Sequence, residues 1–107
     1  MERRSHERVP AHLDTRLFYG NMIYAGVVYN LSESGMFIHT RVSFPVDSVL
    51  LSLIRSGESI VKLPIRVRRH ADKDYRMKHY NEAGLGVELM KKSVDYIEMV
   101  NTVKASL

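Results

Sequence analysis

Residues 12–31, HLDTRLFYGNMIYAGVVYNL, carry the pattern of two β-strands joined by a tight turn. In the first half, Leu13, Thr15 and Leu17 occupy alternate positions and define one side, which is typical of a half-buried strand. The Gly-Asn pair at 20–21 is a strong hairpin-turn signal. The second half is rich in β-branched and aromatic side chains, which favour strands. The stretch therefore predicts an antiparallel hairpin.

Four further strand signals follow this hairpin, separated by turn residues and by one long polar segment. In the longest of them, apolar side chains at every second position from Val61 to Val67 define one buried face, which specifies the register of that strand. Pro64 has no N–H to donate, so it predicts an edge strand or a bulge. Residues 71–83 are polar and non-periodic, and they predict a long loop. The six expected strands span residues 12–19, 22–31, 36–41, 48–55, 59–70 and 85–90.

Beyond the sixth strand the apolar period changes to that of a helix. Ser93 is a suitable N-cap, and the negative charge of Asp95 in the first turn complements the helix dipole. Apolar residues at helical spacing from Tyr96 to Val103 predict a helix over residues 93–105 that packs on the strands. Six short strands and a terminal helix predict an all-β antiparallel barrel or sandwich.

The size and composition of the chain indicate one ordinary globular domain, spanning residues 1–107, with 45% hydrophobic and 26% charged residues. No apolar run approaches the roughly 18–20 residues of a membrane span, and no apolar segment typical of a signal peptide follows the first residues. The absence of cysteine excludes disulfides and thiolate metal sites. We therefore expect a cytoplasmic protein. The formal net charge of +4 favours an anionic partner without identifying it.

Three arginines are grouped near the N-terminus, in the segment Arg3-Arg4-Ser-His-Glu-Arg8. Guanidinium groups are planar forks that suit phosphate oxygens and the O6/N7 edge of guanine. Arg4 and Arg8 are four residues apart and share a face in a helix or in a strand, whereas Arg3 reaches the other side. We expect residues 1–11 to form an arm laid against the domain.

A second short motif, Asn30-Leu-Ser32-Glu-Ser-Gly35, follows the hairpin. Asn30 and Ser32 are two residues apart and face the same way at a strand end. The Asn30 amide can accept from one guanine N–H while it donates to a neighbouring acceptor. Gly35 allows a positive φ and a close backbone approach. Together the two motifs predict a site for an anion that also carries guanine edges.

The order RRxxxR followed by NxSxxG resembles the PilZ domain family, the bacterial receptors for the second messenger cyclic di-GMP. The late segment Gly86-Val87-Glu88-Leu89 is similar to a strand of that family, so the resemblance covers most of the chain. Asn30 stands where the family pattern permits Asp or Asn. The resemblance implies a six-stranded antiparallel β-barrel over residues 12–90 with a C-terminal helix, and cyclic di-GMP as the ligand without any cofactor.

The resemblance also implies a role for each site residue. The arginines would hold guanine edges and phosphates, with the first of them assisting the other two. The asparagine would contact a guanine Watson–Crick edge, the serine would bond to ligand or to neighbouring backbone, and the glycine would leave space. The expected ligand-binding residues are Arg3, Arg4, Arg8, Asn30, Ser32 and Gly35.

Catalysis is not expected, because the five histidines show no i,i+4 pair and no nucleophile motif, phosphate loop or metal-ligand spacing is present. Two other binding classes stay open. The barrel could bind single-stranded nucleic acid through a basic groove, but such folds usually have aromatic stacking platforms, and Trp is absent here. The chain could also be a protein–protein adaptor that works without a ligand. Taken separately, the arginines could simply pair with surface acids, and NxSxxG could be an ordinary turn.

Ligand binding is expected to order the arm, since chain ends are poorly ordered unless they are tied down. An effector protein would then recognise the changed surface, as in other order–disorder switches. The expected output surface is the loop 71–83 with the neighbouring strand, and its basic residues are Arg66, Arg68, Lys73, Arg76 and Lys78.

Overall fold

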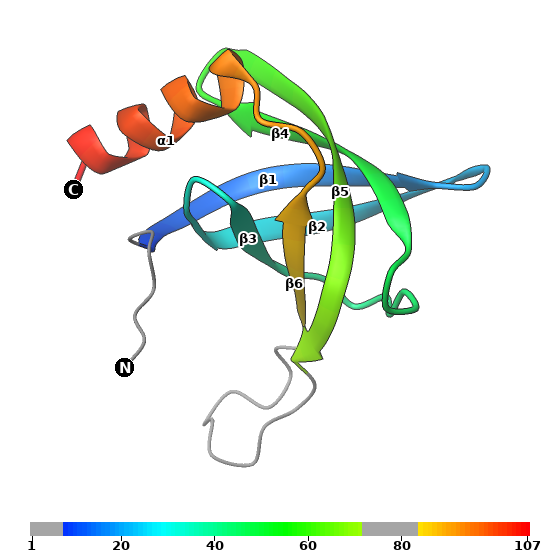
Figure 1. The fold of residues 1–107 in the computed structure, drawn as a ribbon. Coiled ribbons are helices and arrows are strands. Elements are labelled where there is room, and N and C mark those ends of the chain that lie inside the picture. The colour runs from blue at the N-terminus through cyan, green and yellow to red at the C-terminus, as the bar shows by residue number, and fades with distance from the viewer. Residues whose placement is uncertain (1–7, 72–83) are drawn as a thin grey trace, which may run out of the picture.

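The computed structural model describes residues 8–71 and 84–107, which form six strands and one C-terminal helix (Figure 1). The elements are β1 Val9–Tyr19, β2 Met22–Leu31, β3 Gly35–His39, β4 Val49–Ser56, β5 Ser59–Ala71, β6 Gly84–Leu89 and α1 Val94–Ala105. All six expected strands and the expected helix are therefore present, with ends displaced by a few residues at most.

The strands close into one antiparallel barrel in the order β1-β2-β3-β6-β5-β4. The closing contact joins β1 to β4, where Thr15 lies opposite Ile54. In this seam the buried Thr15 hydroxyl lies 3.0 Å from the Ser52 hydroxyl and donates to the Leu53 carbonyl at 2.9 Å. Closure decides between the barrel and the sandwich that the strand pattern left open.

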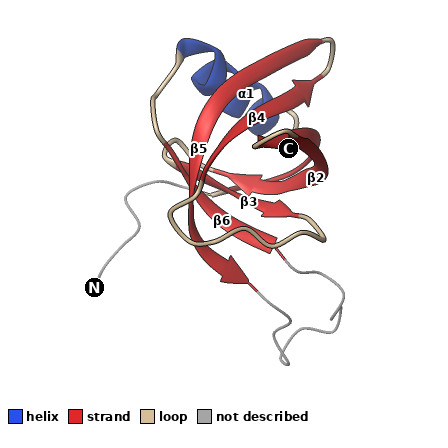
Figure 2. Ribbon diagram, turned by 90° about the vertical axis from the view of Figure 1, so that its right-hand side faces the viewer, coloured by secondary structure: helices blue, strands red, loops and turns tan. Residues whose placement is uncertain are grey.

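Aliphatic side chains from alternate strand positions fill the barrel, as the period of two in a strand requires. Leu17 and Ile38 are completely buried there. α1 packs against one end of the barrel (Figure 2). Its side chains Tyr96 and Met99 are buried. Its N-cap is Ser93 as expected, with the Ser93 side chain accepting from the Tyr96 N–H at 3.1 Å. Within the described residues no helix is long and apolar enough to cross a membrane.

β1 begins before the position expected from the sequence. Val9 is buried and Pro10 lies opposite Asn30, so these residues belong to the barrel wall and not to an arm of residues 1–11. The pairing of β1 with β2 is irregular between Pro10 and Leu13. Such an irregularity accommodates a residue that cannot donate to the ladder, which is why the proline does not end the strand.

The prediction that Pro64 marks an edge strand or a bulge is wrong. Pro64 lies in β5, which has a neighbour on each side in the closed barrel, and the β5 bulge falls between Val67 and Arg69. The register of β5 with β6 starts at Ile65, so no β6 residue opposite Pro64 requires its missing N–H. Its carbonyl accepts from the Met90 N–H at 3.2 Å.

Candidate functional site

The second motif lies at the end of β2 and in the turn that follows. The register of β2 with β3 shifts between Val28 and Asn30, so this end of β2 contains a bulge. Val28 and Leu31 are consequently both buried, although a regular strand would turn them to opposite faces. Asn30 is left half-buried, opposite Phe37 of β3.

Arg8 joins the first motif to the second. Its Nη1 donates to the Asn30 Oδ1 at 2.5 Å. Arg8 immediately precedes β1, and the antiparallel pairing of β1 with β2 brings the start of one strand to the end of the other. Two expected site residues that are distant in the sequence are therefore in contact. The other two arginines of the motif, Arg3 and Arg4, lie outside the described residues.

Ser32 supports the turn between β2 and β3 from a position that is 4% exposed. Its N–H donates to the Gly35 carbonyl at 2.9 Å, and its hydroxyl lies 3.4 Å from the same oxygen. The hydroxyl also accepts from the Ser34 N–H at 3.3 Å. These bonds give Ser32 the backbone partners that were one of the two alternatives expected for it.

Gly35 is required because β6 approaches it closely. It lies opposite Glu88, and a Cβ at this position would stand 2.5 Å from the Val87 carbonyl oxygen. Among the described glycines, positive φ angles occur at Gly20 and Gly57 and not at Gly35. The close approach is confirmed, with a strand of this chain as the neighbour, whereas Gly35 does not adopt the positive φ that a glycine allows.

A tyrosine of α1 completes the turn from the inside of the barrel. Tyr96 has no exposed surface, and its hydroxyl donates to the Ser32 carbonyl at 2.6 Å and lies 3.2 Å from the Gly35 carbonyl. Burial raises the pKa of Tyr96 well above its usual range, against the opposing effects of the Ser32 hydrogen bond and the Arg8 charge. Sequence reasoning counted Tyr96 only as an apolar helix residue. The available signal was its hydroxyl, which needs a partner when the ring is buried.

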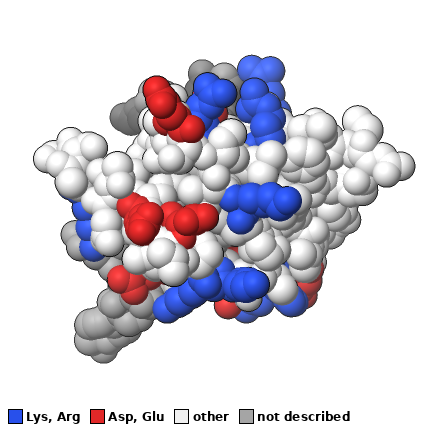
Figure 3. All heavy atoms as spheres, turned by 90° about the horizontal axis from the view of Figure 1, so that it is seen from above, with Lys and Arg blue, Asp and Glu red and all other residues white. Residues whose placement is uncertain are grey.

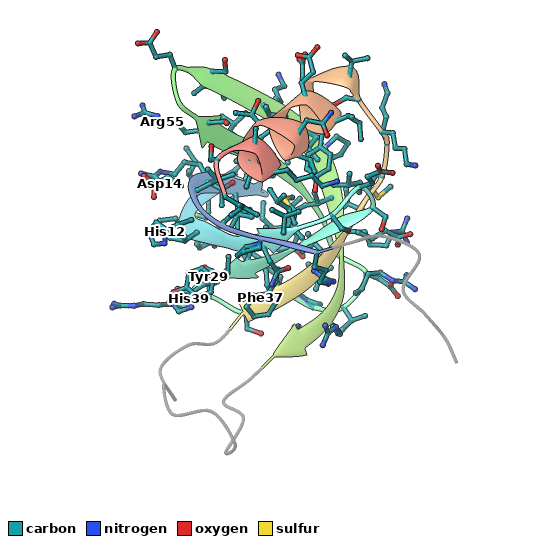
Figure 4. All side chains as sticks on the ribbon, turned by 90° about the vertical axis from the view of Figure 1, so that its left-hand side faces the viewer. His12, Asp14, Tyr29, Phe37, His39 and Arg55 are labelled. Atoms are coloured by element: carbon teal, nitrogen blue, oxygen red, sulfur yellow. The ribbon has the colours of Figure 1, made fainter. Side chains whose placement is uncertain are left out.

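Ring side chains of β1, β2 and β3 pack side by side on the outer wall (Figure 4). Tyr29 stacks on His39 with ring centroids 5.2 Å apart, and on His12 at 6.2 Å. Phe37 lies 6.5 Å from Tyr29 and covers Gly84, where a Cβ would collide with its ring. The faces of the Tyr29 ring are thus directed at neighbouring imidazoles and are not a free platform.

Basic and acidic side chains are mixed on the described surface beside the site. Arg68 of β5 lies 3.4 Å from Glu88 and 3.8 Å from Asp47. Because these side chains are more than half exposed, at 56%, 55% and 66%, the pairs contribute little to stability, but they balance the Arg68 charge. On the face seen from above, the Lys and Arg side chains of the described residues are interspersed with Asp and Glu (Figure 3).

The described part of the site offers hydrogen-bonding groups and one guanidinium charge. Arg8 and Asn30 present them beside a turn whose backbone is held by Ser32 and Tyr96. Within residues 8–71 and 84–107, no group of three or more His, Asp or Glu side chains is placed to hold a metal ion. The arrangement can bind a polar, anionic ligand on the outer wall of the barrel.

Comparison with known families is consistent with this geometry. The sequence model of the PilZ domain matches residues 2–102, which include both motifs. The chain therefore belongs to the PilZ domain family, and the resemblance inferred from the motifs is confirmed. No curated protein sequence matches the chain.

Solved PilZ structures share the fold at low sequence identity. The Bacillus subtilis inhibitor of motility MotI/DgrA superimposes with a TM-score of 0.80 at 18% identity, over 99% of this chain and 51% of that protein. The PilZ domain of Escherichia coli YcgR with c-di-GMP gives 0.78 at 13% identity, over 99% of this chain and 92% of that one. The K. pneumonia MrkH–c-di-GMP complex gives a TM-score of 0.77 at 13% identity, over 98% of this chain and 52% of that one. The chain spans about half the length of MotI and MrkH, and at these identities the likeness establishes the barrel fold.

Proposed function

We propose that this chain is a receptor that binds cyclic di-GMP without modifying it. PilZ domains are ligand-binding receptor domains, and the similar structures of YcgR and MrkH contain c-di-GMP. The observation that carries the proposal is the contact between Arg8 and Asn30, which places the guanidinium of one motif against the amide of the other. A guanidinium fork beside an amide suits a ligand that has both phosphates and guanine edges.

The proposed roles follow from where each group lies. Arg8, together with Arg3 and Arg4 of the same motif, would bind phosphates and the O6/N7 edges of guanine. Asn30 would contact a guanine Watson–Crick edge with whichever amide atom Arg8 leaves available. The buried turn residues would act indirectly, by holding the backbone beside Asn30.

Single-stranded nucleic acid is the less favoured ligand. Base-stacking proteins of this kind use exposed ring faces along a basic groove. Here the Tyr29 ring is stacked between His12 and His39, and the charges seen from above are mixed in sign (Figures 3 and 4). Both observations support a small anionic ligand over a polymer.

We further propose that the ligand-bound form signals in the cytoplasm to an effector protein. The expected output surface combines strand β5 with the loop 71–83, but residues 72–83 lie outside the described part of the chain. Of its basic residues, Arg66 and Arg68 are on β5, and Arg68 is balanced by two carboxylates. Reversal of the loop charges Arg76 and Lys78 to Glu tests this surface.

Calorimetric titration of cyclic di-GMP tests the receptor proposal. Arg8→Ala removes a charge-assisted contact worth about 1–3 kcal/mol, so the affinity should fall by a factor between about 5 and about 150. The matched control is Arg55→Ala, because Arg55 is another exposed arginine, on β4 at the hairpin with β5. That variant should bind as the wild type does.

Three outcomes of the titration contradict the receptor proposal. The first is no heat with saturating cyclic di-GMP, and the second is equal losses in Arg8→Ala and Arg55→Ala. The third is tighter binding of a random oligonucleotide in moderate salt, which favours the nucleic-acid alternative.

A further inference from the structure

Two carbonyl groups of the NxSxxG turn converge on one buried hydroxyl. The Tyr96 Oη lies 2.6 Å from the Ser32 carbonyl and 3.2 Å from the Gly35 carbonyl. A tyrosine hydroxyl has one proton, so the shorter contact identifies the Ser32 carbonyl as its main acceptor. The Gly35 carbonyl also accepts from the Ser32 N–H at 2.9 Å. Removal of the hydroxyl would therefore deprive mainly the Ser32 carbonyl of its donor, and Ser32 is only 4% exposed.

The position of this hydroxyl is set by α1 and not by the turn. The Tyr96 N–H is bonded to the N-cap side chain of Ser93, and the next residue donates its N–H to the Ser93 carbonyl at 3.1 Å. Met99 and Val100, on the following helical turn, are buried beside it in the barrel. The helix thus presents a fixed donor to Ser32, which lies 64 residues earlier in the sequence.

We infer that Tyr96 is a positioning residue of the ligand site, whose hydroxyl holds the Ser32–Gly35 turn in the conformation that cyclic di-GMP requires. This inference rests on the proposed function. The turn begins two residues after Asn30, so its backbone determines where the Asn30 amide stands. A site held in its binding conformation before the ligand arrives avoids an ordering cost on binding.

The electrostatic surroundings support this placement beneath the site. The Arg8 charge is one of the causes that act on the pKa of Tyr96, in the direction that lowers it. Arg8 contacts Asn30 on the outer wall, and Tyr96 contacts the turn from the core. The two side chains therefore hold the same short segment from opposite sides of the barrel wall.

Tyr96→Phe tests the inference because it keeps the ring and removes only the hydroxyl. Without the hydroxyl the turn is no longer held in the free protein, so binding must restore its conformation at the cost of about one hydrogen bond. The affinity for cyclic di-GMP should therefore fall about 3- to 10-fold. In the ligand-free protein, hydrogen exchange at the Ser32 and Ser34 amides should become faster, because the Ser32 carbonyl no longer anchors the turn.

Two control variants separate the hydroxyl from general stability. Val100→Ala weakens the packing of α1 but leaves the hydroxyl in place, so it should lower the melting temperature and retain the affinity. Tyr24→Phe removes a hydroxyl at the opposite end of β2, where the Tyr24 ring packs on Phe44, and should change neither quantity.

Unchanged affinity together with unchanged amide exchange in Tyr96→Phe overturns the inference. An equal affinity loss in Val100→Ala also overturns it, since helix docking in general would then be the cause. If the wild type binds no cyclic di-GMP, the proposed function fails, whereas amide exchange in the ligand-free variants still shows separately whether Tyr96 holds the turn. If Tyr96→Phe does not fold, the Tyr96 hydroxyl proton of the wild type gives the answer by NMR. It should exchange slowly and slow further with ligand, and rapid exchange contradicts the inference.

Discussion

Arg8 and Asn30 illustrate how one hydrogen bond assembles a site from separate parts of the sequence. The bond joins a guanidinium to a neutral amide oxygen at 2.5 Å, so the Arg8 charge is not cancelled by this partner. An aspartate at position 30, which the family pattern permits, would form an ion pair with Arg8 instead. Compared with an aspartate, the asparagine therefore leaves more of the Arg8 charge to act on the ligand that we propose.

At the same scale, Tyr96 makes the free energy of unfolding depend on pH in the alkaline range. Burial raises its pKa in the folded state, whereas the pKa of a tyrosine in the unfolded chain is about 10. Above that pH the unfolded state binds fewer protons than the folded state, so the free energy of unfolding falls as pH rises. The stabilisation by Tyr96 is thus complete below about pH 10 and is lost progressively above it.

Thermal melts from about pH 8 to about pH 11 measure this effect. The difference in melting temperature between the wild type and Tyr96→Phe should shrink across the upper part of that range. Tyr24→Phe is the control variant, because it removes a tyrosine hydroxyl at the opposite end of β2 from the turn that Tyr96 contacts. A wild-type advantage that stays constant up to pH 11 would mean that the Tyr96 hydroxyl does not titrate differently in the two states.

Among the elements, β6 constrains the site although it contributes no residue to either motif. Its backbone approaches β3 so closely that Gly35 has no room for a side chain. On the other side, Arg69 of β5 lies across Gly86, where a Cβ would be 3.0 Å from the Arg69 side chain. One contact is with backbone and the other is with a long, exposed side chain that can move.

This difference predicts unequal costs for two glycine substitutions. Gly35→Ala forces apart the backbones of β3 and β6 and should lower the free energy of unfolding by about 1–3 kcal/mol. Gly86→Ala should cost clearly less, because the Arg69 side chain can shift and alanine is better than glycine in a strand. Urea denaturation of both variants measures the two costs. Equal losses would show that β6 does not crowd Gly35 more than Arg69 crowds Gly86.

At the scale of the whole molecule, the proposed site lies where three distant parts of the chain meet. The start of β1, the end of β2 and the N-terminal part of α1 contribute Arg8, Asn30 and Tyr96 respectively. The pairing of β1 with β2 and the packing of α1 on the barrel bring these parts together, and the turn of the β1–β2 hairpin extends away from them (Figure 1). A ligand at this junction should therefore stabilise one end of the molecule.

Hydrogen exchange with and without cyclic di-GMP tests this distribution. We expect slower exchange in residues 30–35 and in residues 1–11, of which residues 1–7 lie outside the described part of the chain. The β1–β2 hairpin turn at Gly20-Asn21 should serve as an internal control with unchanged exchange, since it lies at the opposite end of that hairpin from Arg8 and Asn30 (Figure 1). Equal protection of residues 1–11 in both states would contradict ordering of the arm by the ligand. Uniform slowing throughout the barrel would indicate general stabilisation.

The sequence by itself determined the elements and the chemistry of the motifs. Alternation of apolar side chains located the first and the longest strand, β-branched and aromatic residues located the second, the Gly20-Asn21 pair located the first turn, and Ser93 located the start of the helix. These features depend on residues that are neighbours in the chain, so local periodicity and turn chemistry encode them. The paired motifs likewise indicated the family, because each is a short run of residues.

Only the tertiary structure decided how those elements meet. Closure of β1 onto β4, the contact of Arg8 with Asn30 and the hydrogen bond from Tyr96 to the turn each join residues far apart in the sequence. It also showed that Gly35 serves a close approach of β6 and not a positive φ. A one-dimensional pattern specifies which face of a strand is buried, but not which atoms lie against it. That choice depends on long-range pairing and packing, because a buried hydroxyl or a crowded glycine is defined by its neighbours in space.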